Sequence, residues 1–420
     1  QANWDIYCST AKASSEGLEC GAPERLTTDP GVDKSPAIVV TADGSAALVW
    51  QGWRKDRSGI FFRRCLDGRW GEPEVVGEGP ANDWNPAIAA TGDGSLAVSW
   101  SRWQNGSYDV CLRVWDVNHW SPVRVIAGTD RFEAHPSMVY DDQRTLWIAY
   151  EEGRAGWGMD SNSAGLRSER NVRLCCYRDR RVGTPDATAA LTLPQKLTDC
   201  SEMAHLAVDG QGVAWLFFRS SNKRGVWEVY GTWLGDEGWA TPQKLRQSAA
   251  GQNIRLAAVA DAEGRLRVVW VSDHRVNQVG KDSYLYTALM PSGSPRSQPF
   301  ELVEKTPVDP AAKQADGPGP RPDYEFGGKR LGLYYGDLHR HTELSVCRTG
   351  GDGSLEDGYR YAIDAANLDF LCLTDHVQHV KILNDYDIFI WSQRQGWECV
   401  ADPSGKGNLV QINRLGTNVG

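Results

Sequence analysis

The segment that decides the fold is PAIVVTADGSAALVW, which runs from Pro36 to Trp50. It recurs from Pro86 to Trp100 and, more loosely, from Pro136 to Tyr150, so that each copy starts 50 residues after the previous one. In the first two copies an Asp-Gly pair, Asp43-Gly44 or Asp93-Gly94, lies between two apolar runs. Asp-Gly suits the positive φ angles of a tight hairpin, so each copy predicts two antiparallel strands.

The second half of each unit also recurs, because Trp70 and Trp120 are each followed by a proline and an apolar pair. Further copies of the first half begin near Leu206 and Leu256. Four strands in about 50 residues, repeated along a chain, are typical of a β-propeller. The third unit has an extra polar stretch near residues 159–170, which predicts a loop insertion.

We therefore expect an all-β propeller over residues 1–303, with full blades beginning near residues 36, 86, 136, 204 and 256. Residues 4–27 resemble only the outer half of another blade. This predicts five full blades plus a partial one, with six or more in the intact protein, and a chain that is a fragment at both ends. Trp53 and Trp103 occupy equivalent positions, where they either stack on sugars or pack within the blades.

Composition disfavours two classes of function. The net charge of −9 argues against binding to the phosphate backbone of nucleic acids. No run of about 18 apolar residues occurs, so no segment is predicted to span a membrane. The ten cysteines do not identify the redox compartment, so the localisation stays open and an extracytoplasmic one is compatible with the sequence.

The pattern changes after the propeller. Residues 304–329 carry five prolines and few apolar residues, and they are predicted to form a linker. Residues 330–420 then begin a second domain, in which a short apolar strand runs from Leu331 to Tyr335. A capping-box pattern at Ser354 predicts a helix, and a second strand runs from Asp369 to Leu373. The expected unit is strand, helix, strand.

Polar side chains follow both of these strands, at the edge where α/β folds bind ligands. A His-x-His at the end of a strand places both imidazoles on the same side of the sheet. We therefore expect His339 and His341 to bind a divalent metal ion together with His376, which follows the second strand. Asp337 and Asp375 are close enough in sequence to orient or share this site. The alternative is that these are ordinary surface histidines.

These motifs together resemble the opening of the PHP family, the polymerase and histidinol phosphatase family, and most of all an uncharacterised PHP-like branch. The likeness covers residues 331–395 and is carried by GDLHRHTELS (336–345), DGSL (352–355), YRYA (359–362), LDF (368–370) and TDH (374–376). It implies a distorted (β/α) barrel that holds two or three zinc, manganese or iron ions. The implied activity is hydrolysis of a phosphoester by metal-activated water.

The resemblance implies His339, His341 and His376 as metal ligands and Asp337 and Asp375 as catalytic or supporting carboxylates. Only the first βαβ part of the barrel is expected, because so short a segment cannot close one.

Weaker candidates also occur in this segment. Arg340 and Arg348 could hold a phosphate group, Cys347 could complete a zinc site, and Glu398 could replace a missing glutamate ligand. For each of them the alternative is a solvated or loop side chain with no role in a site.

The leading hypothesis from the sequence is a metal-dependent hydrolase of PHP type, a phosphoesterase in the intact protein. In it the propeller would present a small-molecule or polymeric substrate, and the chain by itself is expected to be inactive. The rival hypothesis is a propeller scaffold that binds a glycan or a protein beside an inactive PHP remnant. A third is a glycosidase with its site on the propeller axis, although the turn at Asp43 does not match the motif common in sialidases.

Overall fold

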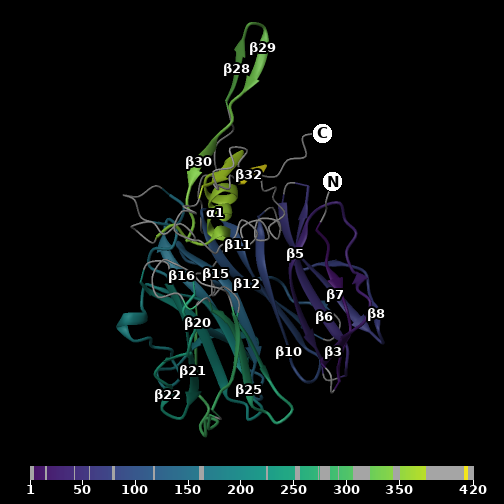
Figure 1. Cartoon of the computed structure of the whole chain (residues 1–420), viewed down its shortest axis with the longest axis vertical. Coiled ribbons are helices and arrows are strands. Elements are labelled where there is room, and N and C mark those ends of the chain that lie inside the picture. The colour runs from purple at the N-terminus through teal and green to yellow at the C-terminus, as the bar shows by residue number, and fades with distance from the viewer. Residues whose placement is uncertain are drawn as a thin grey trace.

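The computed structural model shows an all-β propeller that carries a short helix, α1 (Leu355–Arg360), over one face (Figure 1). The structure describes residues 4–14, 17–41, 43–55, 57–77, 81–116, 119–159, 165–223, 226–250, 256–272, 274, 284–291, 293–305, 322–343, 351–374 and 411–414. No helix among these residues is long and apolar enough to cross a membrane.

Five antiparallel sheets follow one another along the chain as blades, and the first strand of each lies innermost. The first blade contains β5 (Asp33–Val40), β6 (Ala46–Arg54), β7 (Arg57–Leu66), β8 (Arg69–Trp70) and β9 (Glu74–Val75). The second contains β10 (Asp83–Ala90), β11 (Leu96–Gln104), β12 (Ser107–Asp116), β13 (His119–Trp120) and β14 (Arg124–Ala127). The third contains β15 (Arg131–Tyr140), β16 (Leu146–Ala155), β17 (Asn171–Arg178) and β18 (Arg181–Pro185).

The last two blades have the same strand order. The fourth contains β19 (Ser201–Val208), β20 (Ala214–Lys223), β21 (Val226–Gly235), β22 (Gly238–Trp239) and β23 (Gln243–Lys244). The fifth contains β24 (Ala257–Ala260), β25 (Leu266–Ser272) and β26 (Tyr284–Leu289). After it, β27 (Leu302–Glu304) returns to pair with β18 of the third blade, and a short 3₁₀ helix (Gln195–Leu197) precedes the fourth. The five predicted blades are therefore confirmed.

The same bulge recurs at the start of the inner strands, where one residue has a positive φ. These residues are Ser35, Asn85, His135 and Met203, with φ of 52°, 48°, 54° and 54°. The backbone N–H of the bulge donates to a second-strand side chain of the preceding blade. The pairs are Asn85 to Gln51 at 3.4 Å, His135 to Ser101 at 3.0 Å and Met203 to Glu151 at 2.8 Å. One repeated position thus joins each blade to the next.

The repeated tryptophans hold each blade together from within. Trp50 Nε1 donates to Asp33 Oδ1 at 2.9 Å, and Trp100 Nε1 makes the equivalent bond to Asp83 at 2.9 Å. A buried indole keeps its burial free energy only if its N–H finds such a partner. Trp53 and Trp103 lie in a cluster with other aromatic rings, the Trp103 and Tyr108 ring centres being 5.0 Å apart. The packing interpretation of these two residues is the one that the structure shows.

Residues 4–27 supply two short strands that match the outer part of a blade. They are β1 (Tyr7–Cys8) and β4 (Glu24–Arg25), and a hairpin of β2 (Ala11–Ser14) and β3 (Gly17–Cys20) lies between them in sequence. Leu26 N donates to Ile6 O at 2.8 Å, which repeats the bond from Val76 N to Ile60 O at 2.8 Å in the first blade. A sixth blade in the intact protein remains a prediction.

The segment after the propeller contains one hairpin and one small mixed sheet. The hairpin consists of β28 (Asp323–Phe326) and β29 (Lys329–Gly332), so it includes part of the expected linker and the start of the strand predicted from Leu331. The sheet consists of β30 (Gly336–Arg340), β31 (Phe370–Leu373) and β32 (Gln411–Arg414). The strand before the His-x-His motif therefore begins five residues later than predicted, because Leu331 pairs within the hairpin.

The order strand, helix, strand occurs here, but a barrel does not. β30 and β31 are parallel with α1 and a π-helical turn (Tyr361–Ala365) between them, whereas β32 runs antiparallel to β31. Among the described residues the sheet has three strands and one short helix, so the expected barrel segment is not shown. The predicted capping box is present, since Ser354 Oγ accepts from Asp357 N at 3.1 Å and Asp357 Oδ2 accepts from Ser354 N at 2.9 Å.

Candidate functional site

The two histidines of the His-x-His motif converge at the end of β30. Their Nε2 atoms lie 3.1 Å apart, and both rings are accessible. Two nitrogens that each sit about 2.0–2.1 Å from one zinc ion are separated by a similar distance. Asp337 Oδ1 accepts from the backbone N–H of His339 at 2.9 Å within β30. The pair fits two ligands of one metal ion.

The rest of the predicted metal site is only partly described. His376, Asp375, Arg348, Cys347 and Glu398 lie outside the described residues. Within the described ranges no group of three or more His, Cys, Asp or Glu side chains could hold a metal ion. The guanidinium of Arg340 stacks on the ring of Tyr361, 4.9 Å from its centre, so it packs against the π-helical turn.

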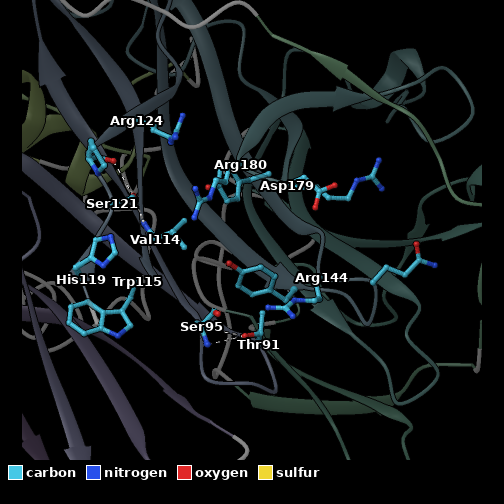
Figure 2. A pocket seen from close by; sticks show the side chains of 15 residues that line it. Thr91, Ser95, Val114, Trp115, His119, Ser121, Arg124, Arg144, Asp179 and Arg180 are labelled. Atoms are coloured by element: carbon cyan, nitrogen blue, oxygen red, sulfur yellow. Dashed lines mark hydrogen bonds between the residues drawn. The ribbon is translucent and has the colours of Figure 1, made fainter. Parts of the chain in front are cut away.

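A second concave site, called the blade groove, lies between the second and third blades. Its volume is about 590 Å³, within the range of ligand pockets. It is lined by Thr91, Ser95, Val114, Trp115, His119, Ser121, Pro122, Arg124, Tyr140, Gln143, Arg144, Tyr177, Arg178, Asp179 and Arg180. Figure 2 shows how the labelled arginines, His119 and Trp115 lie around it. Four arginines against one aspartate make the groove strongly basic in a chain whose net charge is −9.

The repeat provides an internal comparison for this charge. Arg124 pairs with Leu112 in the second blade as Glu74 pairs with Phe62 in the first. Arg178 likewise occupies the position of Asp116, since each pairs with the residue that opens the fourth strand of its blade. Two arginines of the blade groove thus stand where the neighbouring pair of blades has carboxylates. The fold itself does not require cations there.

Arg144 has a second unusual feature, its backbone conformation. It lies in the turn between the first and second strands with φ of 63°, where the other four blades place a glycine. The four glycines are Gly44, Gly94, Gly212 and Gly264, with φ of 79°, 90°, 82° and 76°. A side chain in this region costs about 1 kcal/mol relative to glycine. Arg144 also pairs with Asp93 at 2.6 Å, but an exposed ion pair contributes only about 0–1 kcal/mol.

A third site, called the axial mouth, lies at the opposite end of the strands, beneath α1 (Figure 1). Its side chains are all buried. They come from the first and second strands of the blades and from, or directly before, the third strands, near the end of each blade that faces α1. They are Lys34, Trp84, Tyr108, His135, Glu151, Arg170, Glu202 and Arg219. The mouth is covered by four carboxylates that follow the propeller in sequence, called the acidic segment. They are Glu343, Glu356, Asp357 and Asp364.

Two fully buried arginines of the mouth each bind one propeller carboxylate and one carboxylate of the acidic segment. Arg170 donates to Glu151 at 2.6 Å and to Asp357 at 2.9 Å. Arg219 contacts Glu202 and donates to Glu343 at 2.9 Å. Burial acts to lower the pKa of Arg170, but the two carboxylates outweigh it and raise the pKa. Both guanidinium groups therefore stay charged in a buried site.

Asp364 lies deepest among aromatic residues of the propeller. Its carboxylate accepts from Asn82 Nδ2 at 2.6 Å, from Trp84 Nε1 at 2.9 Å and from the Tyr108 hydroxyl. Burial raises the pKa of Asp364 to about 6, although these donors and the nearby Arg360 act to lower it. The propeller consequently binds the ionised carboxylate of Asp364 more weakly than its protonated form.

Docking of α1 is expected to weaken between about pH 4 and pH 6. Because the docked pKa of Asp364 lies above its ordinary value of 3.8, its contribution is complete below pH 3.8 and is lost as pH rises through about 6. Hydrogen exchange of α1, expressed as a protection factor, should fall several-fold over this interval. Asp364→Asn should flatten the profile. An equally steep profile in that variant would assign the titration to another group.

None of the mouth residues was identified as functional from the sequence. The sequence does contain one indication of them, which is a residue that differs from the repeat. Arg219 occupies the second-strand position that holds Gln51, Ser101 and Glu151 in the first three blades. Those three accept the bulge N–H of the next blade, which a guanidinium cannot do. The blade groove was missed because its two walls lie far apart in the sequence.

Comparisons with known proteins find similar solved structures but no matching family. No family model matches the sequence, and no curated protein matches it, so the likeness to the PHP family rests on the quoted motifs. Similar solved structures include a protein of unknown function from Dyadobacter fermentans, with 10% identity, 62% of this chain and 79% of that chain covered, and a TM-score of 0.44. A Hadza microbial sialidase shows 13% identity, coverage of 65% and 63%, and a TM-score of 0.42.

A Penicillium chrysogenum α-L-arabinanase complexed with arabinobiose shows 14% identity, coverage of 68% and 85%, and a TM-score of 0.44. Similarity at this level does not identify a function. The described residues form a five-bladed β-propeller with the acidic segment docked over one face.

Proposed function

We propose that this chain is a binding protein whose propeller holds an anionic glycan in the blade groove. The observation that supports it is a difference between equivalent positions of neighbouring blades. Arg124 and Arg178 line the groove between the second and third blades, where the first and second blades have Glu74 and Asp116. The two replacing arginines, Arg124 and Arg178, lie with Arg144 and Arg180 in one concavity, which also contains Trp115, Tyr140 and Tyr177. The glycan-binding scaffold that was the rival hypothesis from the sequence therefore becomes the leading one.

The chemistry of the groove suits sugars that carry uronate or sulfate groups. A guanidinium binds such groups through two parallel N–H donors, and the hydrogen bonds are charge-assisted. Aromatic rings offer flat apolar surface to the faces of sugar rings. Serine, threonine and glutamine side chains at the rim, such as Ser95 and Gln143, supply donors and acceptors for hydroxyl groups. The groove therefore offers cations to the anionic groups of such a sugar and aromatic rings to its apolar faces.

Titration calorimetry against three matched probes tests this proposal. A sulfated oligosaccharide, an oligogalacturonate and a neutral oligosaccharide of equal length would be titrated into the full chain, with polyglutamate as the acidic peptide. We expect binding of one or both anionic sugars, weakened by salt, and little binding of the neutral one. Binding of polyglutamate but of neither sugar, if Arg124→Glu/Arg144→Gly abolishes it, would instead assign the groove to a protein partner and overturn the proposal.

A metal-dependent hydrolase of PHP type is a second candidate function. The approach of His339 Nε2 and His341 Nε2 to 3.1 Å at the end of β30 favours it, because two imidazole nitrogens at this separation can bind one ion. A divalent ion held there would lower the pKa of a bound water. His376, Asp337 and Asp375 would complete or support the site, and Arg340 and Arg348 would be the candidates for a phosphate group, as the family resemblance implies.

Metal content distinguishes this candidate from ordinary surface histidines. We expect the purified chain, incubated with zinc, manganese or iron and desalted, to retain metal by plasma mass spectrometry. The double variant His339→Ala/His341→Ala should lose it, whereas His119→Ala, which removes an exposed histidine of the propeller, should not. Equal metal in all three proteins, or none in any, would remove the support for this candidate.

A further inference from the structure

We infer that the axial mouth is a second binding site, for ligands that carry carboxylate groups, and that the acidic segment occupies it in cis. This site is separate from the blade groove, because Trp84 lies at the start of β10 whereas Thr91 follows its end. The inference does not depend on the proposed glycan function of the groove.

The charge of the mouth is built from two positions of the repeat. The second-strand position holds Gln51, Ser101, Glu151 and Arg219, and the third-strand position holds Ser58, Tyr108, Arg170 and Trp227. Blades whose residues at these positions are neutral form the same sheets. Arg170 and Arg219 are therefore additions to the fold rather than requirements of it.

The propeller by itself leaves these arginines with too few acceptors. Each guanidinium carries five N–H donors, but the propeller supplies a single carboxylate to each, Glu151 to Arg170 and Glu202 to Arg219, and the carbonyl oxygen of Leu166 also accepts from Arg170 at 3.1 Å. Lys34 adds a further buried amine, and burial lowers its pKa to about 8. The acidic segment provides the missing carboxylates through Asp357 and Glu343. A ligand with two or more carboxylates offers the same groups.

The fit of the acidic segment is incomplete, which makes exchange for a better ligand feasible. Among the described residues, Arg170 Nε, Arg219 Nε and Arg360 Nη1 are buried without a hydrogen-bond acceptor. A buried donor without an acceptor forfeits its solvation. In addition, burial raises the pKa of both Glu343 and Asp364, whereas nearby cations outweigh burial at Glu356 and Asp357 and lower the pKa of both. The segment thus fills the mouth at a cost that a complementary ligand would avoid.

The loop inserted in the third blade makes a further contact with the chain that carries the acidic segment. Arg167 N donates to Gly351 O at 3.2 Å, and Trp157 Nε1 fixes the loop by donating to Leu166 O at 2.7 Å. At Gly165 the backbones approach so closely that an added Cβ would lie 1.9 Å from Gly351 O. A single methyl group at Gly165 therefore opposes docking while leaving every charged residue of the mouth in place.

Gly165→Ala tests the inference in the full chain. The background carries Arg124→Glu and Arg144→Gly, so that the blade groove does not contribute. A trimer of galacturonate would be titrated calorimetrically, and hydrogen exchange of α1 would be followed in parallel. We expect at least tenfold tighter binding than in the background protein, together with faster exchange of α1. Gly235→Ala is the control, since an added Cβ there meets nothing within 4 Å.

Two further results are required. Addition of Arg219→Gln to the Gly165→Ala protein should remove the gained affinity, and saturating galacturonate should speed exchange of α1 even in the protein with glycine at 165. If Gly165→Ala frees α1 but no carboxylate ligand binds, the inference is wrong and the mouth is only an interface within the chain. Binding that leaves α1 exchange unchanged would place the ligand elsewhere and overturn it equally. Failure at the blade groove would not affect either result.

Discussion

Replacing Arg170 with methionine is expected to lower the free energy of unfolding by about 3–5 kcal/mol. Methionine fills most of the volume but leaves Glu151 and Asp357 buried with no cation between them. It also removes the contact of the guanidinium with the Phe132 ring, whose centre lies 3.7 Å away. Partial protonation of the carboxylates would reduce the loss, so the effect should be largest above pH 6.

Denaturant unfolding of the full chain measures this effect, and Arg173→Met is the matched control. Arg173 lies on β17, the strand that begins directly after Arg170, and it pairs with Glu152 at 2.8 Å, but its side chain is half-exposed. An exposed ion pair of this kind is worth about 0–1 kcal/mol. Similar losses in the two variants would show that burial does not strengthen the Arg170 contacts and would contradict the description of the mouth.

The double variant Arg124→Glu/Arg144→Gly is expected to bind anionic glycans about 100-fold more weakly. Each arginine contributes about 1.5–3 kcal/mol through charge-assisted hydrogen bonds, and 1.4 kcal/mol is a factor of ten in affinity. Both replacements introduce the residue that the preceding blade has at the same position, Glu74 and Gly94. The change should therefore leave the fold intact.

Stability should respond in the opposite direction to affinity. Arg144→Gly alone relieves a positive φ, worth about 1 kcal/mol, and removes an exposed ion pair with Asp93 worth about 0–1 kcal/mol. We expect stability to be unchanged or slightly increased while binding weakens. Arg69→Ala, an exposed arginine of the first blade, should alter neither quantity. A large loss of stability in Arg144→Gly would assign Arg144 to the fold rather than to a ligand.

Much of the propeller could be predicted because its determinants are local and repeated. The tight turns, the apolar strands and the aromatic residue of the second strand recur at intervals of 50 residues in the first three blades. The capping box at Ser354 was predicted for the same reason, since its two partners lie three residues apart. The convergence of His339 and His341 followed from their spacing at the end of a strand, although the strand begins later than expected.

The barrel expectation and the linker boundary could not be corrected from the sequence. Tyr324 pairs with Leu331 in a hairpin, which moves the following strand to Gly336. The apolar run from Leu331 predicted one strand, but its first residues pair within the hairpin instead. Because β28 and β29 are exposed on both faces, they lack the two apolar runs that would have predicted this hairpin. The predicted metal ligand His376 and its neighbour Asp375 lie outside the described residues, so their roles remain predictions.

The sequence by itself determined the blades, their turns and the internal register of each repeat. Only the tertiary structure decided which side chains of different blades meet. Arg124 reaches the same groove as Arg180, and Arg170 reaches Asp357, because the ring brings together strand ends that are distant along the chain. Local sequence patterns indicate where a hairpin is stable, because the residues that stabilise it are close together in the chain. Contacts between blades depend on how the sheets pack around an axis, and no single segment of sequence contains that information.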